Sequence, residues 1–582
     1  MTSTPAPRGD VRVSSRVRWW PRVWVLVLGL VLLGPALLPG YVLSYDMVWV
    51  PKLALRSEVW GLGALLPRNV PSDALVALAN TVLPGMLIQK CVLVAATVGA
   101  GLAGLRFGGA SLLGRTLAGT VYLWNPFVVE RLAIGHWPLL ISYAVLPVLL
   151  THAEHFRRHR EVRPALIWSL VAACLTPSAG VMAFLVLIVT ALDWRLPRLR
   201  PASAPGWRSV GHVVALGALA NAPWVTAGLA HVQDARSTVA GGSVFGLSAE
   251  GSLSAPLAAL GLGGIWNSDV VPWSRATPIA GLALLLFLPL GGLGLWLIRH
   301  LERPMDLPLR HVSPSRDHAH DLIVLWVFGY GLALMTWAAP GLMGWLAGTV
   351  PGGGLMRDGA RWLALCAPLV ATTVAVGGVW LTRRTPAAVR GLVALLLVGL
   401  PVLTLPDAAF GLSGALRPAT YPSEYAAVRT LLVNRARDVV YLPYSPYRAP
   451  DWNHNRPVLD PLPRYLSANP IVSDQLSVNG RRIEGESRYS AKVRSALSAA
   501  DPAQGLRDLG LRYVVIDKTA PGPRAKIEGQ SMWNGDRLRV LDLGPTTVQT
   551  QPRAGARGLV GLGWLGFAAL LGYSVVVDRR SN

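Results

Sequence analysis

The chain has 582 residues, of which 52% are hydrophobic and only 15% are charged, and its mean hydropathy is +0.42. Soluble domains carry about 25% charged residues, so this composition excludes an ordinary soluble protein and indicates an integral membrane protein. The net charge of +23 does not indicate a nucleic-acid partner, because most arginines lie in short loops between apolar segments. Basic residues in such loops mark the cytoplasmic side, where anionic lipids are the expected partners.

The apolar segments are about 15–22 residues long, which suits helices that cross a hydrocarbon core about 30 Å thick. Residues 1–22 are basic, and the following apolar run ends Leu-Leu-Pro-Gly without a small-x-small cleavage site. We therefore expect an uncleaved first helix with its N-terminus in the cytoplasm. The sequence predicts about twelve transmembrane helices, at residues 23–42, 84–105, 116–129, 138–151, 165–178, 180–193, 210–229, 277–298, 321–340, 361–381, 391–406 and 558–577.

Eleven of these helices belong to a membrane domain at residues 23–409, whose outer loops are 43–82, 125–137, 230–276 and 341–361. The composition then becomes polar from 410 to 553, with a helical pattern opening at 421–425 and strand patterns at 438–443, 513–517 and 538–543. This segment is long enough for one independent core. The predicted fold class is a polytopic α-helical membrane protein with a small extracytoplasmic α/β domain. Residues 554–582 form the last helix and a short cytoplasmic tail.

Asp46 follows the first apolar segment at once, in the stretch from Tyr45 to Lys52. An acid at the rim of a membrane is costly to dehydrate, so it indicates a functional site. The alternative is an ordinary solvated aspartate in a loop.

Two other outer loops also carry charges of both signs at the membrane rim. Glu130, Arg131 and His136 lie between the third and fourth predicted helices, and a second group follows the Gly352–Gly354 run at Arg357, Asp358 and Arg361. One interpretation is that neighbouring charges neutralise one another as structural ion pairs. The other is that the loops bind a lipid-linked phosphate, which requires cations that keep their charge.

Under the second interpretation, Asp46 is the base that takes a proton from an acceptor hydroxyl. His136 then hydrogen-bonds the phosphate or steadies the carboxylate, and Lys52 faces the site or anchors its loop to lipid headgroups. The residues expected to bind substrate and phosphate are Lys52, Glu130, Arg131, His136, Arg357, Asp358 and Arg361. Tyr444, Tyr447 and Trp452 either stack on an acceptor sugar or form the edge of the domain core.

A carboxylate after the first helix, in a large outer loop, with many helices and a C-terminal extracytoplasmic domain, resembles the GT-C glycosyltransferases. Residues 125–147 look like the corresponding segment of actinobacterial arabinofuranosyl- and mannosyltransferases, and residues 355–362 resemble an outer loop of related proteins. The resemblance covers about residues 20–400 and implies that Asp46 matches the catalytic acid. Many members carry an acidic pair where this chain has Tyr45-Asp46, which leaves a divalent cation as an open alternative.

The resemblance implies an inverting transfer from a polyprenyl-phosphate sugar to an envelope glycan, glycolipid or glycoprotein, on the outer face of the plasma membrane. A transporter or flippase of a lipid-linked or anionic substrate is the alternative. Transporters keep polar groups near the bilayer midplane, whereas this chain concentrates them at the outer rim. A non-catalytic membrane subunit with a docking domain is a third interpretation.

Overall fold

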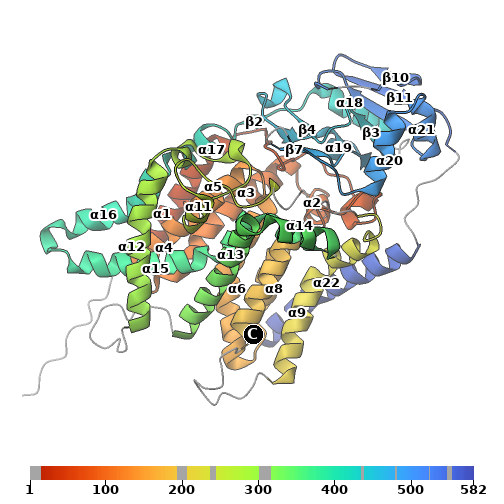
Figure 1. Ribbon diagram of the computed structural model, residues 1–582. Coiled ribbons are helices and arrows are strands. Elements are labelled where there is room, and N and C mark those ends of the chain that lie inside the picture. Colours follow the sequence, from red (N-terminus) through yellow and green to blue (C-terminus); the bar gives the residue numbers. More distant parts are fainter. Residues whose placement is uncertain are drawn as a thin grey trace, which may run out of the picture.

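The computed structural model describes residues 15–192, 206–235, 244–300, 316–350, 352–433, 438–478, 481–522, 525–546 and 554–581. A large helical bundle carries a smaller α/β domain at one end (Figure 1). Most of the predicted basic N-terminus, residues 1–14, and short parts of the predicted 410–553 domain lie outside the described residues.

Within the described residues, eight helices are long and apolar enough to cross a membrane. A ninth crossing results if the bent pair η8 (Gly359–Leu365) and α15 (Ala367–Arg384), with an angle of 48° between them, is one span. The chain is therefore a multi-pass membrane protein. The eight helices are α1 (Ser15–Leu33), α3 (Gly85–Gly104), α6 (Trp137–His159), α9 (Trp207–Ala230), α12 (Ile279–His300), α13 (Arg316–Ala338), α16 (Ala387–Thr404) and α22 (Ala554–Ser581).

Nine of the twelve predicted segments coincide with these candidate spans, if the bent pair is counted as one span. The segments predicted at 116–129, 165–178 and 180–193 are the short helices α4 (Leu112–Leu123), α7 (Pro164–Ala173) and α8 (Pro177–Ala191). A crossing needs about 20 residues. Polar caps and prolines determine where the short helices end and the next ones begin. After α4, the Asn125 side chain accepts a hydrogen bond from the Val128 N–H, and a new helix, α5 (Pro126–Ala133), begins at Pro126.

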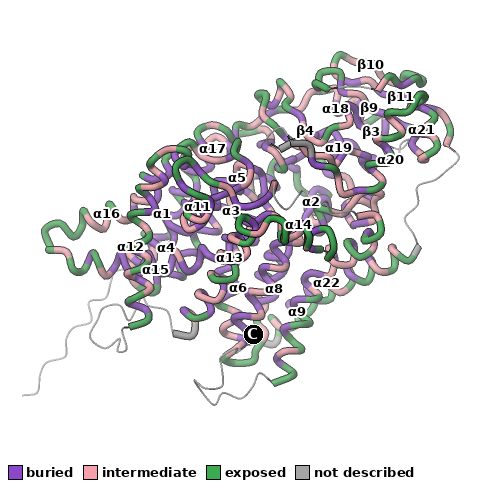
Figure 2. The backbone as a smooth tube through the Cα atoms, viewed as in Figure 1, coloured by how far each residue is buried: buried purple, intermediate pink, exposed green. Residues whose placement is uncertain are grey.

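Short elements in the membrane part connect the long helices. They are η1 (Gly34–Leu37), β1 (Tyr41–Val42), η2 (Ser57–Trp60), α2 (Ser72–Ala79), η3 (Leu105–Gly108), α11 (Ala255–Leu260), η4 (Ser268–Val270), η5 (Trp273–Ala276), α14 (Pro340–Thr349), η7 (Gly353–Met356), η9 (Pro406–Ala408) and α17 (Ala409–Ser413). Buried residues fill the centre of the bundle, whereas α16 projects from it and is largely exposed (Figure 2).

The α/β domain is built on a five-stranded sheet with the order β10-β11-β9-β3-β6. Strand β3 runs parallel to β6 and β9, and β11 is antiparallel to β9 and β10. The helices and strands of this part are β2 (Pro418–Ala419), α18 (Ser423–Leu432), β3 (Asp438–Leu442), β4 (Tyr447–Arg448), η10 (Asp451–Asn453), β5 (Val458–Leu459), α19 (Leu462–Tyr465), β6 (Asn469–Ile471), β7 (Leu476–Val478), β8 (Arg481–Ile483), α20 (Arg488–Leu497), α21 (Pro502–Asp508), β9 (Tyr513–Asp517), β10 (Gln530–Asn534) and β11 (Leu538–Asp542).

Alternating side chains of the central strands bury both faces of this sheet. Val440 and Val514 share one core with α20 and α21, whereas Val439 and Val515 share another with α18. The period-two alternation of strands explains this division. Strands β3, β9 and β11 lie where the sequence predicted strands.

The loop between α1 and α3, residues 43–82, is bound tightly to the α/β domain. Backbone bonds join Tyr45 N to the Pro457 carbonyl at 2.8 Å and Leu459 N to the Tyr45 carbonyl at 2.7 Å. Arg464 and Asp73 are held by two hydrogen bonds of 2.7 Å, with side chains only 15% and 11% exposed. The core that contains Val439 and Val515 also contains residues of the loop and of the membrane bundle. The loop, the domain and the bundle therefore pack as one body.

The Arg464–Asp73 pair predicts a large stability effect when one partner is removed. Asp73→Ala leaves the Arg464 guanidinium buried without its counter-charge, and we expect a loss of about 3 kcal/mol in the free energy of unfolding. Asp451→Ala is the matched control: it breaks an exposed pair with Arg537, and exposed pairs contribute about 1 kcal/mol or less. Thermal unfolding in detergent measures both. Equal losses in the two variants would contradict the assignment.

Candidate functional site

Asp46 is placed by a turn that packs between two parts of the chain. Its backbone N–H donates to the Ile134 carbonyl at 3.0 Å, and the preceding residue, Tyr45, has φ = +44°. This left-handed conformation costs a bulky residue about 1–3 kcal/mol, so the surrounding contacts must enforce it. Gly135 allows the close approach, because a Cβ on it would lie 2.3 Å from the backbone N of Met47.

Both carboxylate oxygens of Asp46 accept a hydrogen bond. The Tyr447 hydroxyl donates to Oδ1 at 2.6 Å, and Nε2 of His136 lies 3.1 Å from Oδ2. Although protein surrounds the group closely, its side chain keeps 40% of its surface exposed. The carboxylate is therefore fixed in orientation and still open to a ligand.

Arg131 determines which nitrogen of His136 carries the proton. Nη1 of Arg131 lies 3.2 Å from Nδ1 of His136, and a guanidinium can only donate, so Nδ1 must accept. The proton of the neutral ring is then on Nε2, which donates to Asp46. Burial, together with the positive charges of Arg361 and Arg131, lowers the pKa of His136 despite the opposing effect of Asp46, which supports the neutral ring.

Asp358 lies between two arginines at the other end of this chain of contacts. Arg131 donates to its two oxygens at 3.0 Å each, and Nε of Arg361 lies 2.8 Å from Oδ2. The Arg131 side chain is 1% exposed, whereas that of Arg361 is 30% exposed. Burial alone would raise the pKa of Asp358, but the two arginines outweigh it and hold this pKa below its usual range. Arg131 is thus neutralised, and Arg361 is the accessible cation.

The ionisation of Asp46 follows from these neighbours. Burial acts to raise its pKa, but the hydrogen bonds from His136 and Tyr447 and the charge of Arg361 outweigh burial and hold the pKa below its ordinary value of 3.8. A carboxylate stabilised in this way is ionised at neutral pH and accepts hydrogen bonds only.

Glu130 faces a different group of buried charges. It hydrogen-bonds Glu250, whose carboxylate also accepts from Nε of Arg275 at 2.7 Å. Burial and the charge of Glu250 raise the pKa of Glu130 well above its usual value, against the effects of Arg275 and Arg131. Glu130 is therefore protonated, and helix α5 carries two neighbouring side chains into two separate networks.

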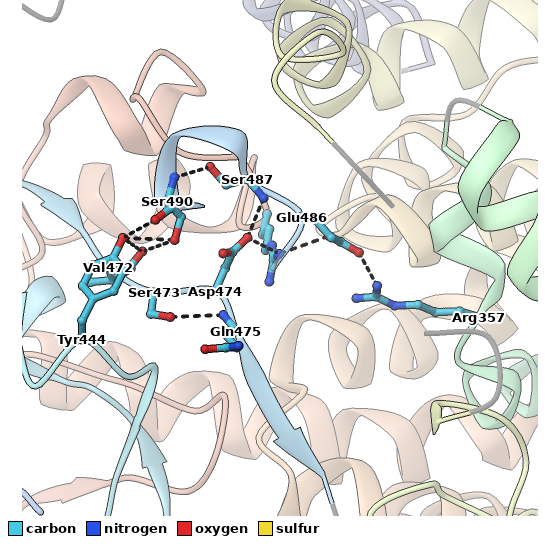
Figure 3. A network of polar contacts seen from close by, with 10 residues as sticks. Arg357, Tyr444, Val472, Ser473, Asp474, Gln475, Glu486, Ser487 and Ser490 are labelled. Carbon is cyan, nitrogen blue, oxygen red and sulfur yellow. Dashed lines mark hydrogen bonds and ion pairs between the residues drawn. The ribbon is translucent and has the colours of Figure 1, made fainter. Parts of the chain in front are cut away.

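The remaining sequence-predicted residues lie outside the Asp46 cluster. Arg357 pairs with Glu486 of the α/β domain (Figure 3). Its guanidinium carbon also lies 4.6 Å from the centroid of the Phe245 ring. Tyr444 donates to the Val472 carbonyl at 3.1 Å, within the α/β domain. Lys52 is exposed, and Trp452 packs on Tyr421 and Tyr425.

A cavity of about 270 Å³ lies among the helices next to α5. Its walls are mostly apolar and come from α4, α12, α13, α15 and α16, with Arg275 as a charged side chain in the lining. Asn125 and Pro126, where α5 begins, are part of the wall. Among the described residues, no group of three or more His, Cys, Asp or Glu side chains has the geometry to hold a metal ion.

This architecture is similar to that of a solved glycosyltransferase. The structure of arabinofuranosyltransferase AftD from Mycobacteria matches with a TM-score of 0.53 and 14% sequence identity, over 91% of this chain and 40% of the AftD chain. The chain has the GT-C fold. The resemblance inferred from sequence is therefore confirmed for the fold, and this chain spans about two fifths of the length of AftD.

Two further structures match more weakly. A mutant of mycobacterial AftD gives a TM-score of 0.49 at 14% identity, over 91% of this chain and 42% of that chain. ArnT from Cupriavidus metallidurans in the apo state gives a TM-score of 0.38 at 11% identity, over 92% of this chain and 100% of that chain. No protein-family model and no curated protein sequence matches the chain.

The GT-C fold brings together residues that sequence reasoning did not connect. The Tyr45 hydroxyl donates to Asp269 at 3.1 Å, and Glu130 hydrogen-bonds Glu250, which in turn pairs with Arg275 at 2.7 Å. Asp269, Glu250 and Arg275 lie in a Gly- and Ser-rich segment, residues 230–276, without a regular spacing. Charged residues are few in this segment, and that scarcity is the sequence feature that could have identified these three as functional candidates.

Substitutions of Arg131 and Glu130, two neighbouring residues of α5, should differ strongly in their effect on stability. Arg131→Ala leaves Asp358 buried with one cation fewer, and we expect a loss of about 3 kcal/mol or more in the free energy of unfolding. Glu130→Gln is the matched control, because Glu130 is protonated and glutamine can donate to Glu250 in the same way; its effect should stay within about 1 kcal/mol. Thermal unfolding of the two variants is the measurement. A larger loss in Glu130→Gln than in Arg131→Ala would show that the charge states are assigned wrongly.

Proposed function

We propose that the protein is a membrane glycosyltransferase that transfers a sugar from a polyprenyl-phosphate donor to a cell-envelope acceptor. The observation that carries this proposal is the fixed, ionised and accessible carboxylate of Asp46, directly after the first membrane helix of a GT-C fold. An arabinofuranosyltransferase with this fold supports the reaction class. A glycan, glycolipid or glycoprotein of an actinobacterial envelope is the proposed acceptor.

Asp46 acts as the base in this mechanism. Its carboxylate accepts the proton of an acceptor hydroxyl while the acceptor oxygen attacks the anomeric carbon. The bond between that carbon and the phosphate oxygen breaks, and polyprenyl phosphate leaves with the electron pair. Attack from the face opposite the phosphate inverts the anomeric configuration.

Arg361 is the proposed ligand of the donor phosphate. It is the more exposed of the two arginines on Asp358, and its charge acts on Asp46, so phosphate and base would lie close together. Arg131 serves to orient Asp358 and His136, since its guanidinium is already engaged by both. A permanent cation beside a departing phosphate stabilises the charge that develops there.

The apolar cavity beside α5 supports a lipid-linked donor. Its lining from several membrane helices is suited to hydrocarbon, and it begins at the residues that start α5. We place the site and the α/β domain on the extracytoplasmic side, with both termini in the cytoplasm, because the basic loops alternate with the site-bearing loops along the sequence. Anionic lipids would then face the basic loops.

The base assignment predicts that Asp46→Asn abolishes transfer while the protein stays folded. The amide cannot take up a proton, so we expect the rate to fall by about 100-fold or more. Proteoliposomes supplied with polyprenyl-phosphate arabinofuranose, and in parallel with polyprenyl-phosphate mannose, plus delipidated envelope glycan, measure the transfer.

Asp508→Asn is the matched control for this substitution, because Asp508 is an exposed carboxylate of α21 bonded only to Gln504 among the described residues. It should transfer at the wild-type rate. Full transfer by Asp46→Asn would remove Asp46 from the mechanism.

The pKa shifts of His136 and Asp46 predict a transfer rate that does not change with pH above pH 6.5. The pKa of His136 lies below its ordinary 6.5 and that of Asp46 below 3.8, so neither group changes protonation above pH 6.5. When His136 protonates below pH 6.5, its Nδ1 no longer accepts from Arg131, and the rate should fall. The transfer rate against pH tests this, and an acid limb centred above pH 6.5 would contradict it.

A further inference from the structure

The α/β domain contributes a side chain to the Asp46 carboxylate from a part of the chain about 400 residues away in sequence. Tyr447 lies in β4, which pairs with β5, and β5 in turn joins the backbone of Tyr45. Asp46 and Tyr447 are thus held on one continuous set of backbone hydrogen bonds. Their contact is fixed by the backbone and does not depend on the side chains alone.

Arg448 reinforces this position from the other side of β4. Its side chain is 4% exposed, pairs with Asp460 at 3.0 Å and donates to the carbonyls of Pro443, Ser445 and Tyr447. A buried guanidinium bound to three carbonyls and one carboxylate restricts the turn before β4. The Tyr447 ring also packs edge-on against the Tyr45 ring, with 6.3 Å between centroids.

The chemistry of the contact is a phenol donating to an ionised carboxylate. Burial and the negative charge of Asp46 raise the pKa of Tyr447 well above its usual value, so the phenol keeps its proton at neutral pH. Charge-assisted hydrogen bonds of this length are among the stronger ones in proteins. His136 holds the other oxygen, so the two donors together fix the plane of the carboxylate and lower its basicity.

We propose that Tyr447 is a positioning residue through which the α/β domain orients the Asp46 carboxylate for proton transfer. The domain thereby contributes a side chain that the site needs for the orientation of Asp46. The inference rests on the proposed function for its catalytic consequence, whereas the effect on Asp46 itself needs no substrate.

The test is Tyr447→Phe, which removes the hydroxyl and keeps the ring. Losing the hydrogen bond should raise the pKa of Asp46 by about one unit. A water-soluble carbodiimide with glycine ethyl ester labels protonated carboxyl groups, and Asp46 is exposed enough to react. At about pH 5 the labelling rate at Asp46, followed by mass spectrometry, should rise about tenfold, since above the pKa the protonated fraction rises tenfold per unit. Labelling at Asp508 should not change.

Tyr489→Phe is the matched control, because Tyr489 donates to the Leu509 carbonyl within the same domain and lies in α20. It should leave the Asp46 labelling rate and transfer unchanged. In the transfer assay, Tyr447→Phe should lower kcat about tenfold with little change in the KM for the polyprenyl-phosphate sugar.

An Asp46 labelling rate equal to wild type in Tyr447→Phe, or an unchanged kcat, would overturn the proposal. A failure of the proposed function would look different. In that case Asp46→Asn would transfer sugar at the wild-type rate, while the labelling shift at Asp46 would still be present.

Discussion

Arg131 binds Asp358 through two nitrogen atoms and donates through one of them to His136, and each of these contacts fixes the next. Arg131 is buried, so its positive charge requires the counter-charge of Asp358. A guanidinium can only donate hydrogen bonds, so Nδ1 of His136 must be unprotonated in order to accept one. His136 then offers its single proton to Asp46. One buried guanidinium thus sets the tautomer of a histidine and, through it, the orientation of the Asp46 carboxylate.

The same carboxylate is held from the opposite direction by the α/β domain. Residues 43–82 pair with that domain through backbone bonds and the buried Arg464–Asp73 pair, so this loop and the domain form one support. In the membrane bundle, α5 supplies Arg131 and the residue before α6 is His136, while the domain supplies Tyr447. Asp46 lies where these two supports meet. A GT-C membrane scaffold and an α/β domain are therefore both needed for the geometry at Asp46.

The sequence revealed the features that depend on local pattern. Hydropathy predicted the membrane class and the eight long apolar helices of the described residues, and period-two alternation located β3, β9 and β11. The position of Asp46 after the first helix indicated the candidate site. What pattern did not reveal were the pairings: Arg131 turned out to be neutralised by Asp358, Arg357 pairs with Glu486, and Tyr447 reaches Asp46. Such contacts join residues hundreds of positions apart, and charge spacing along the chain carries no information on them. The helices α4, α7 and α8 are shorter than the predicted segments because caps and prolines, which apolarity does not reveal, end them.

We propose that Asp46 and Arg361 face one sugar phosphate from two sides. A cryo-EM structure of the Asp46→Asn variant with polyprenyl-phosphate arabinofuranose, or with polyprenyl-phosphate mannose, tests it most directly. We expect phosphate density within hydrogen-bonding distance of Arg361, the lipid chain in the cavity beside α5, and the sugar between the phosphate and residue 46. Donor density away from Arg361, with no density beside residue 46, would contradict this arrangement of phosphate and base.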